Sequence, residues 1–307
     1  MNAAITARGL TKHYGHRRDP RQRPGRVIEA LTGLDLEIHE GEIFGFLGPN
    51  GAGKTTMIRL LLGYLHPSAG SATVLGFDTE RESQAIRAHV GYLPGGIALY
   101  DTMTGLDLLD YLCGLYRRAP SRRAALADRL EMSAATLRRP VRDYSRGMRQ
   151  KMGIIQALQH DPELVILDEP TEGLDPLMQR AFYDVLADIK REGRTIFFSS
   201  HILSEVERVC DRVAIIRRGR LVALQDVARL LDRRKRHVEM RLVGPAPSLE
   251  GVPGVSAIQT VDGLLTCQLE GDVRPFLAAL DGAAISDLTI EPAHLEEAFL
   301  EYYAEEN

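Results

Sequence analysis

The sequence contains no apolar run of about eighteen residues or more, the length that a helix needs to cross the hydrocarbon core of a bilayer. We therefore expect no membrane-spanning helix. The N-terminal stretch MNAAITARGLTKHYG also lacks the apolar core of a secretory signal peptide. A chain with neither feature is expected to remain in the cytosol.

The sequence also has no two cysteines close together in the chain. Cys113, Cys210 and Cys267 lie far apart, are odd in number and have mostly apolar neighbours, which indicates reduced core thiols rather than disulfides or metal ligands. The net charge is only −4, so the chain lacks the basic character that nucleic-acid binding requires. We find no internal repeats. The 307 residues suffice for one large domain and a small one, or for two of moderate size.

The most informative stretch that is present spans residues 48–56, GPNGAGKTT, and fits the phosphate-binding P-loop pattern G-x-x-x-x-G-K-[ST]. The apolar segment 42–47 before it has strand character, and segment 57–62 after it is helix-like. Glycines, which lack a Cβ, let successive backbone N–H groups face a polyphosphate at the helix N-terminus. In this pattern the lysine reaches the β- and γ-phosphates and the following hydroxyl holds Mg²⁺.

The alternative for this stretch is a glycine-rich turn before a helix, but the agreement of strand, loop and helix favours nucleotide binding. We expect Thr55 to be a Mg²⁺ ligand. The residues expected to contact the nucleotide are Gly48, Asn50, Gly51, Gly53, Lys54, Thr55 and Thr56.

Strand-like and helical patterns alternate up to about residue 225, which predicts an α/β fold with a parallel sheet between helices. Helical spacing of Leu and Tyr from 104 to about 159 predicts a helical subdomain at about 96–160, within a nucleotide-binding domain over 1–232. Strand patterns and a short helix after that point, with an amphipathic helix at 294–304, predict a small α+β domain over 233–307. That domain contains no acid–base or metal constellation.

Asp168 and Glu169 end the apolar strand pattern LVILDE, more than a hundred residues after the P-loop. A carboxylate at the C-terminal end of a parallel strand beside a P-loop is where Mg²⁺ needs its Asp. The adjacent Glu169 can orient and deprotonate a water that attacks the γ-phosphoryl group, so it is the candidate general base. Taken alone, Asp-Glu-Pro is merely a strand end before a helix. Together with the P-loop it predicts a site that binds ATP and Mg²⁺.

Residues 144–150, YSRGMRQ, resemble the signature motif of ATP-binding-cassette (ABC) proteins, in a variant frequent in drug-type exporters. Gly173-Leu174-Asp175 resembles the D-loop of this family, and His201 after FFSS resembles its switch histidine. Tyr14 matches the aromatic residue that stacks on adenine. Alone, Tyr14 would be an aromatic at a strand end and His201 a structural histidine. The four motifs, however, follow the family's order and spacing, so the chain resembles an ABC transporter ATPase subunit of the drug or antibiotic exporter type.

This resemblance implies a head-to-tail dimer in which ATP lies between the P-loop of one copy and the signature motif of the other. Ser145 and the backbone N–H of Gly147, at a helix N-terminus, would face the γ-phosphate held by the second copy. Asp175 would link the two sites, and His201 would act with Glu169 in catalysis by sensing the γ-phosphate. The resemblance also implies a membrane-spanning permease as a separate chain, and a cytoplasmic, peripheral location on the inner face of the cell membrane. No nucleic-acid partner is expected.

One position departs from the family. The Q-loop usually places Gln or Glu after a strand such as VGYLP at 90–94, whereas this chain has Gly95 followed by Gly96. A glycine supplies no side-chain amide for Mg²⁺ and the attacking water, and the same loop transmits motion to the membrane partner. The departure therefore concerns the hydrolysis rate and the coupling route rather than ATP binding. Arg146 and Met148, where the commoner signature has Gly and Gln, are a milder variation.

The leading interpretation is an ATPase subunit that powers an ABC exporter. A soluble ABC protein that remodels a ribosome or DNA is the first alternative, but such proteins usually carry two cassettes or a long coiled coil. A weakly hydrolysing, ATP-dependent regulator is the second, motivated by Gly95. An importer ATPase is disfavoured by the signature variant and by the tail at 288–303, which resembles that of exporter ATPases.

Two further segments have open interpretations. Residues 99–116, LYDTMTGLDLLDYLCGLY, form a candidate wall of the permease-docking groove that the resemblance implies, although most of them are expected to pack the helical subdomain. The Arg-rich segment 16–26 is predicted to be an exposed loop. It either meets anionic lipid headgroups or is simply solvated.

Overall fold

The computed structural model describes residues 2–15, 27–232 and 236–291. The chain divides into two compact units, Met1–Leu224 and Gln225–Asn307. The Arg-rich segment 16–26 and the helix predicted at 294–304 lie outside the described residues, as do residues 233–235 at the predicted domain boundary. Among the residues described, no helix has the length and apolar character required to cross a bilayer.

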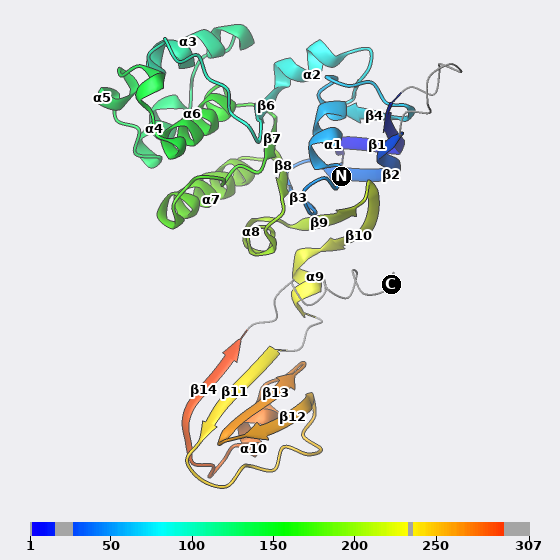
Figure 1. Cartoon of the computed structure of the whole chain (residues 1–307), viewed down its shortest axis with the longest axis vertical. Coiled ribbons are helices and arrows are strands. Elements are labelled where there is room, and N and C mark those ends of the chain that lie inside the picture. Colours follow the sequence, from blue (N-terminus) through cyan, green and yellow to red (C-terminus); the bar gives the residue numbers. More distant parts are fainter. Residues whose placement is uncertain (1, 16–26, 233–235, 292–307) are drawn as a thin grey trace. The chain divides into compact units, whose positions relative to one another are not determined.

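The first unit is built on a six-stranded sheet in the order β10-β9-β3-β8-β7-β6 (Figure 1). Its strands are β3 (Ile43–Leu47), β6 (Val90–Leu93), β7 (Leu164–Asp168), β8 (Thr195–Ser200), β9 (Arg212–Arg217) and β10 (Arg220–Asp226). The pairs β3–β8, β3–β9, β6–β7 and β7–β8 are parallel. Every residue of β3, β7 and β8 is buried, as expected for a parallel sheet covered on both faces. The predicted parallel sheet is therefore confirmed.

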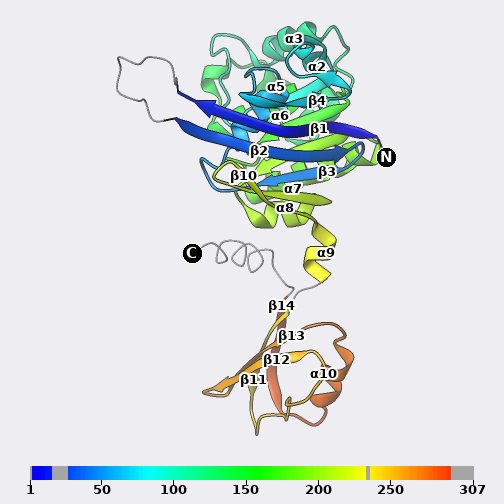
Figure 2. The same cartoon turned by 90° about the vertical axis from the view of Figure 1, so that its right-hand side faces the viewer.

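A second, antiparallel sheet, which the sequence patterns did not predict, accompanies the parallel one. It has the order β2-β1-β4-β5, formed by β1 (Ala3–Tyr14), β2 (Ile28–His39), β4 (Ala69–Val74) and β5 (Phe77–Asp78). Figure 2 shows β1 and β2 side by side. Burial alternates along β2 from Leu34 to Ile38, which is typical of an antiparallel strand with one face on the core. Only Leu75 and Gly76 separate β4 from β5, too few residues for the crossover that parallel pairing needs.

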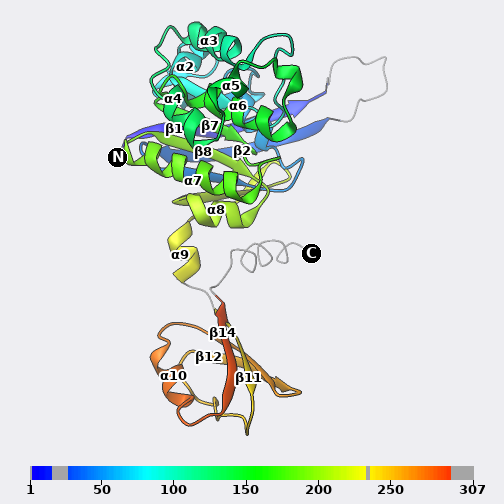
Figure 3. The same cartoon turned by 90° about the vertical axis from the view of Figure 1, so that its left-hand side faces the viewer.

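Helix α1 (Lys54–Leu61) packs between the two sheets and joins them into one core. Fully buried members of this core come from α1, from the antiparallel sheet and from the parallel sheet: Met57, Ile58, Leu31, Ile38, Phe46 and Phe197. On the other face of the parallel sheet lie α7 (Pro176–Arg191), against β8, and α8 (Leu203–Val209), against β3 and β8 (Figure 3).

A run of helices follows β6 in the segment for which the sequence predicts helical structure. The run comprises α3 (Gly105–Tyr116), α4 (Arg123–Arg129), α5 (Ala134–Leu137), a 3₁₀ turn (Val141–Asp143) and α6 (Arg146–Leu158). Helix α2 (Ser83–His89), between β5 and β6, was not predicted, because Ile86 is its only buried residue and leaves no apolar stripe.

The second unit contains a four-stranded antiparallel sheet in the order β12-β13-β11-β14. Its elements are α9 (Val227–Asp232), β11 (Arg236–Leu242), β12 (Val255–Val261), β13 (Leu264–Leu269), α10 (Arg274–Ala279) and β14 (Ile285–Glu291). Phe276 of α10 packs with Val238, Met240 and Leu265 in a small core. Cys267 belongs to the same core, and all three cysteines are free and buried, as predicted.

Candidate nucleotide-binding site

The P-loop connects the end of β3 at Leu47 to the start of α1 at Lys54. Gly51 and Gly53 have φ angles of 81° and 114°, in the left-handed region that favours glycine. A Cβ on Gly48 would lie 2.4 Å from the Ile216 carbonyl oxygen. The loop conformation therefore requires glycine at positions that define the motif. Asn50 and Gly51 are exposed at its tip.

Lys54 folds back over this loop. Its Nζ donates hydrogen bonds to the carbonyl oxygens of Gly48, at 2.7 Å, and Pro49, at 3.3 Å. The same ammonium lies 3.1 Å from Oε1 of Glu169. Only 5% of Lys54 is exposed, so this positive charge is held at the loop rather than in solvent.

The two predicted Mg²⁺ ligands are in direct contact. Thr55 Oγ1 donates a hydrogen bond to Asp168 Oδ2 at 2.9 Å, and Ser199 Oγ donates to Asp168 Oδ1 at 2.6 Å. Sequence reasoning missed Ser199, although a polar residue at the end of the apolar strand TIFFSS was a usable signal.

This pair of oxygen ligands fits Mg²⁺. Among the described residues no group of three or more His, Cys, Asp or Glu side chains is placed to hold a metal. Mg²⁺ is usually bound by one or two protein oxygens, together with waters and substrate phosphates, rather than by an all-protein cage. A hydroxyl and a carboxylate beside a P-loop are a donor set of that kind.

Glu169, at the residue after β7, adopts a left-handed backbone conformation with φ of 51°. This conformation is costly for a residue with a side chain and is found preferentially at functional sites. The Glu169 N–H donates to the Ser199 carbonyl oxygen at 3.1 Å. Its Oε2 lies 2.9 Å from Nδ1 of His201, while Oε1 faces Lys54. The Glu169 carboxylate thus lies between His201 and the P-loop lysine.

Tyr14, the residue predicted to stack on adenine, lies close to the start of α1. Its hydroxyl is 3.4 Å from Thr56 Oγ1, and Lys12 Nζ lies 5.5 Å from the centroid of its ring. This contact joins Tyr14, at the end of β1, to Thr56 in α1.

The signature and D-loop residues cap helices and pack on each other. Ser145 is the N-cap of α6, where its Oγ accepts from the Met148 N–H at 3.2 Å. Asp175 caps α7 by accepting from two backbone N–H groups at 3.0 Å. A Cβ on Gly147 would lie 3.1 Å from the Gly173 carbonyl oxygen, so the two motifs touch. Within the described part of the chain, no hydrogen bond links Ser145 or Asp175 to the P-loop.

Gly95 lies directly beside the predicted metal ligand. A Cβ at this position would be 3.3 Å from the Asp168 carbonyl oxygen and 3.5 Å from its carboxylate. A longer side chain here would therefore reach the metal side of the site, and glycine leaves that space open. Burial, followed by the nearby Asp168 carboxylate, raises the pKa of Tyr92 on β6 to about 12.

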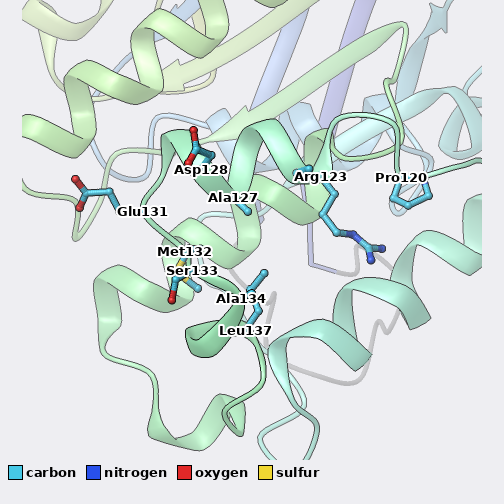
Figure 4. A pocket seen from close by; sticks show the side chains of 10 residues that line it. Pro120, Arg123, Ala127, Asp128, Glu131, Met132, Ser133, Ala134 and Leu137 are labelled. Atoms are coloured by element: carbon cyan, nitrogen blue, oxygen red, sulfur yellow. The ribbon is translucent and has the colours of Figure 1, made fainter.

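A hollow of about 720 Å³ lies elsewhere, at α4 and α5 (Figure 4). Apolar side chains such as Ala127, Met132 and Leu137 line it, with Asp128 and Glu131 among the polar residues. None of the predicted site residues lines this hollow. The candidate nucleotide site is instead a surface site built from backbone groups and strand ends.

Comparison with known proteins agrees with this geometry. A sequence profile described as ABC transporter matches residues 31–172. An uncharacterised ABC transporter ATP-binding protein of Nostoc sp. is 38% identical over 280 residues, which cover 89% of this chain and 83% of the relative. The chain belongs to the ABC transporter ATP-binding protein family. This ABC ATPase therefore binds and hydrolyses ATP, and the resemblance and fold class predicted from the sequence are confirmed.

Two further proteins are similar to this ABC ATPase. A fluoroquinolone export ATP-binding protein of Mycobacterium tuberculosis is 33% identical over 306 residues, which cover 97% of this chain and 92% of the relative. A solved dimeric bacterial ABC transporter cassette is 22% identical, with a TM-score of 0.65 over 73% of this chain and 98% of that chain. The latter shares the fold.

Proposed function

We propose that this ABC ATPase is the ATP-hydrolysing subunit of an exporter and drives a separate membrane-spanning permease. The observation that carries the proposal is the assembled set of Lys54, Asp168, Glu169 and His201 at one sheet edge. The export-named relative supports the direction of transport, because its similarity runs through the C-terminal unit as well as the cassette.

In the proposed site, Lys54 and the loop backbone hold the β- and γ-phosphates while Tyr14 stacks on adenine. Gly48, Asn50, Gly51, Gly53 and Thr56 complete this contact surface. Thr55 and Asp168 would hold Mg²⁺, which neutralises charge on the β- and γ-phosphate oxygens. Ser199 keeps the Asp168 carboxylate oriented through its 2.6 Å hydrogen bond.

Hydrolysis in this proposal is an in-line displacement. A water oriented by Glu169 attacks the γ-phosphorus, its proton passes to the Glu169 carboxylate, and the bond from phosphorus to the β–γ bridging oxygen breaks to release ADP and phosphate. His201, 2.9 Å from Glu169, holds this carboxylate and contacts the γ-phosphate.

A second copy of the chain would complete the site. Ser145 and Gly147 lie at the N-terminus of α6, a position that attracts a phosphate, yet they make no hydrogen bond to the P-loop of their own chain among the described residues. In a head-to-tail dimer they would face the ATP of the other copy, with Asp175 between the two sites. The dimeric cassette of the same fold supports this arrangement.

The proposed location is the inner face of the cell membrane, where the permease would hold the chain peripherally. A second candidate function is a weakly hydrolysing regulator, favoured by the open space that Gly95 leaves beside Asp168. Tight ATP binding with very slow turnover by the purified complex would favour the regulator.

The deciding experiment is a pull-down of the full chain from its native membranes in mild detergent, with Glu169→Gln as a matched bait that retains ATP. We expect both baits to recover a polytopic protein in equal amount. With the natural chain, ATPase activity should depend on this polytopic protein, whereas Glu169→Gln should show no such activity. Recovery from the soluble fraction alone, with ribosomes, DNA or nothing attached, would refute the transport proposal.

A further inference from the structure

A buried carboxylate outside the nucleotide-contacting set joins two loops of the site. Glu205 lies on α8, and only 6% of it is exposed. It accepts hydrogen bonds from the hydroxyl groups of Thr171 and Ser200, the latter at 2.6 Å. Thr171 lies two residues after Glu169, and Ser200 lies immediately before His201. The loop after β7 and the loop after β8 therefore meet at this one side chain.

On the first side, Thr171 begins the turn that leads to the D-loop aspartate. Its carbonyl oxygen accepts a hydrogen bond from the Leu174 N–H at 3.0 Å, and Asp175 then caps α7. The hydroxyl of Thr171 is anchored on Glu205 while its carbonyl closes the turn. Thr171 thus links the Glu205 carboxylate to the turn that precedes α7.

On the second side, Ser200 controls the backbone around His201. The Ser200 hydroxyl donates to Glu205 and accepts from the Ile202 N–H at 2.9 Å. The Ile202 carbonyl oxygen also lies 3.3 Å from this hydroxyl. A hydroxyl has a single proton, and with that proton on the closer Glu205 oxygen its lone pairs are free to accept from the Ile202 N–H. His201 lies between these two residues, with its ring 2.9 Å from Glu169. Ser200 therefore links the Glu205 carboxylate to the backbone on either side of His201.

A third contact comes from α7, which packs beside α8 (Figure 3). Burial raises the pKa of Tyr183 on α7 above its usual value, and the negative charge of the nearby Glu205 carboxylate raises it further. The guanidinium of Arg208 lies 5.1 Å from the centroid of the same ring. A carboxylate taken out of water needs hydrogen-bond donors, and Glu205 has two, the hydroxyl groups of Thr171 and Ser200.

We propose that Glu205 is a positioning residue for ATP hydrolysis, which couples the loop ending at Asp175 to the loop carrying His201. When Asp175 contacts a second copy, for example, the resulting displacement of its loop is transmitted to the histidine beside Glu169. The inference rests on the proposed roles of Asp175 and His201. Glu205 itself is not among the residues proposed to contact the nucleotide.

Hydrogen exchange on the full chain tests the coupling without any partner. Thr171→Val removes one hydroxyl at nearly constant side-chain volume, and Ser200→Ala removes the other. We expect Thr171→Val to raise amide exchange at 201–203, and Ser200→Ala to raise it at 172–175, each by about fivefold or more. Ser204→Ala, at an exposed position of α8, should change neither segment. Faster exchange confined to the mutated loop in both variants would overturn the proposal.

Steady-state kinetics supply the second readout. Glu205→Gln keeps the side-chain volume but replaces an acceptor oxygen by a donor. We expect kcat for ATP to fall about tenfold, because misplacing a catalytic group is costly, while the ATP dissociation constant changes less than about twofold. An unchanged kcat, or an equal loss of binding and turnover, would overturn the proposal. Both readouts need only the chain and ATP with Mg²⁺. Failure to find a permease would therefore refute the transport proposal but not the proposed role of Glu205.

Discussion

The Lys54 ammonium lies 3.1 Å from one carboxylate oxygen of Glu169, and this contact joins the P-loop to the strand that carries the candidate general base. Lys54 follows β3 and Glu169 follows β7, with β8 between these strands in the sheet. Because β3, β7 and β8 are parallel, their carboxyl ends meet at one edge, where open α/β sheets bind their ligands. A γ-phosphate at the P-loop would share the same ammonium.

Replacing Lys54 should abolish nucleotide binding. Lys54→Ala removes the buried cation that would neutralise the β- and γ-phosphates, and charge-assisted hydrogen bonds of this kind support a loss of about a hundredfold or more in ATP affinity. Calorimetric titration with ATP checks this. Lys190→Ala, which removes a lysine paired with Asp211 at the end of α7, is the matched control and should bind as the natural chain does. Unchanged affinity of Lys54→Ala would refute the P-loop assignment.

Glu169→Gln should trap an ATP-bound dimer. The amide keeps the size of the carboxylate but cannot take a proton from the attacking water, so ATP persists between the two copies. Light scattering with ATP and Mg²⁺ should report twice the monomer mass, and the same variant with ADP should stay monomeric. A variant that remains monomeric with ATP counts against the sandwich.

Introducing the side chain that Gly95 lacks should accelerate hydrolysis. Gly95 has an ordinary backbone conformation, and a Cβ would meet Asp168 at 3.3 Å, so Gly95→Gln is accommodated after a small adjustment. Its amide would reach the metal side of the site, and we expect kcat to rise by roughly three- to tenfold with little change in ATP affinity. Gly96→Gln, where a Cβ meets nothing within 4 Å, is the control. Equal turnover in both variants would show that position 95 does not limit hydrolysis.

The first unit should lose stability in mild acid because of His160. Burial, followed by the charge of Arg118, lowers the pKa of this histidine to about 4, and its ring stacks on Tyr116 with a centroid separation of 3.7 Å. In the unfolded chain this histidine binds a proton near pH 6.5, whereas in the folded chain it stays neutral down to about pH 4. Its contribution to the free energy of unfolding is therefore present above pH 6.5 and is lost as the pH falls toward 4.

The expected loss from His160 between pH 7 and pH 5 is about 2 kcal/mol of unfolding free energy. Urea unfolding at the two pH values measures it. His160→Phe retains an aromatic ring against Tyr116 and should remove this part of the pH dependence. If the natural chain and the variant lose the same amount, the histidine is not its source.

Much of the candidate site was predictable because its signals are local. The P-loop needs glycines at fixed spacing. Helix α7 begins with Asp175 as its N-cap and Pro176 at its first position, two residue types that mark a helix start in the sequence. Strands β6 and β13 are short apolar or alternating runs bounded by turns, a pattern that can be recognised from one segment alone. Helix α2, with a single buried residue, offered no such pattern.

By itself, then, the sequence determined the family, the phosphate loop and the identity of the acidic pair, since each depends on residues adjacent in the chain. Only the tertiary structure decided that β1 and β2 form a separate antiparallel sheet, that position 95 faces Asp168, and that Ser199 and Glu205 tie the strand ends together. The contacts of position 95 with Asp168, of Ser199 with Asp168 and of Glu205 with Thr171 join segments far apart in the chain. They form only when the parallel strands bring their carboxyl ends to a common edge. A buried hydroxyl or carboxylate then forms hydrogen bonds with the groups that this edge brings near it, and no local sequence pattern specifies those partners.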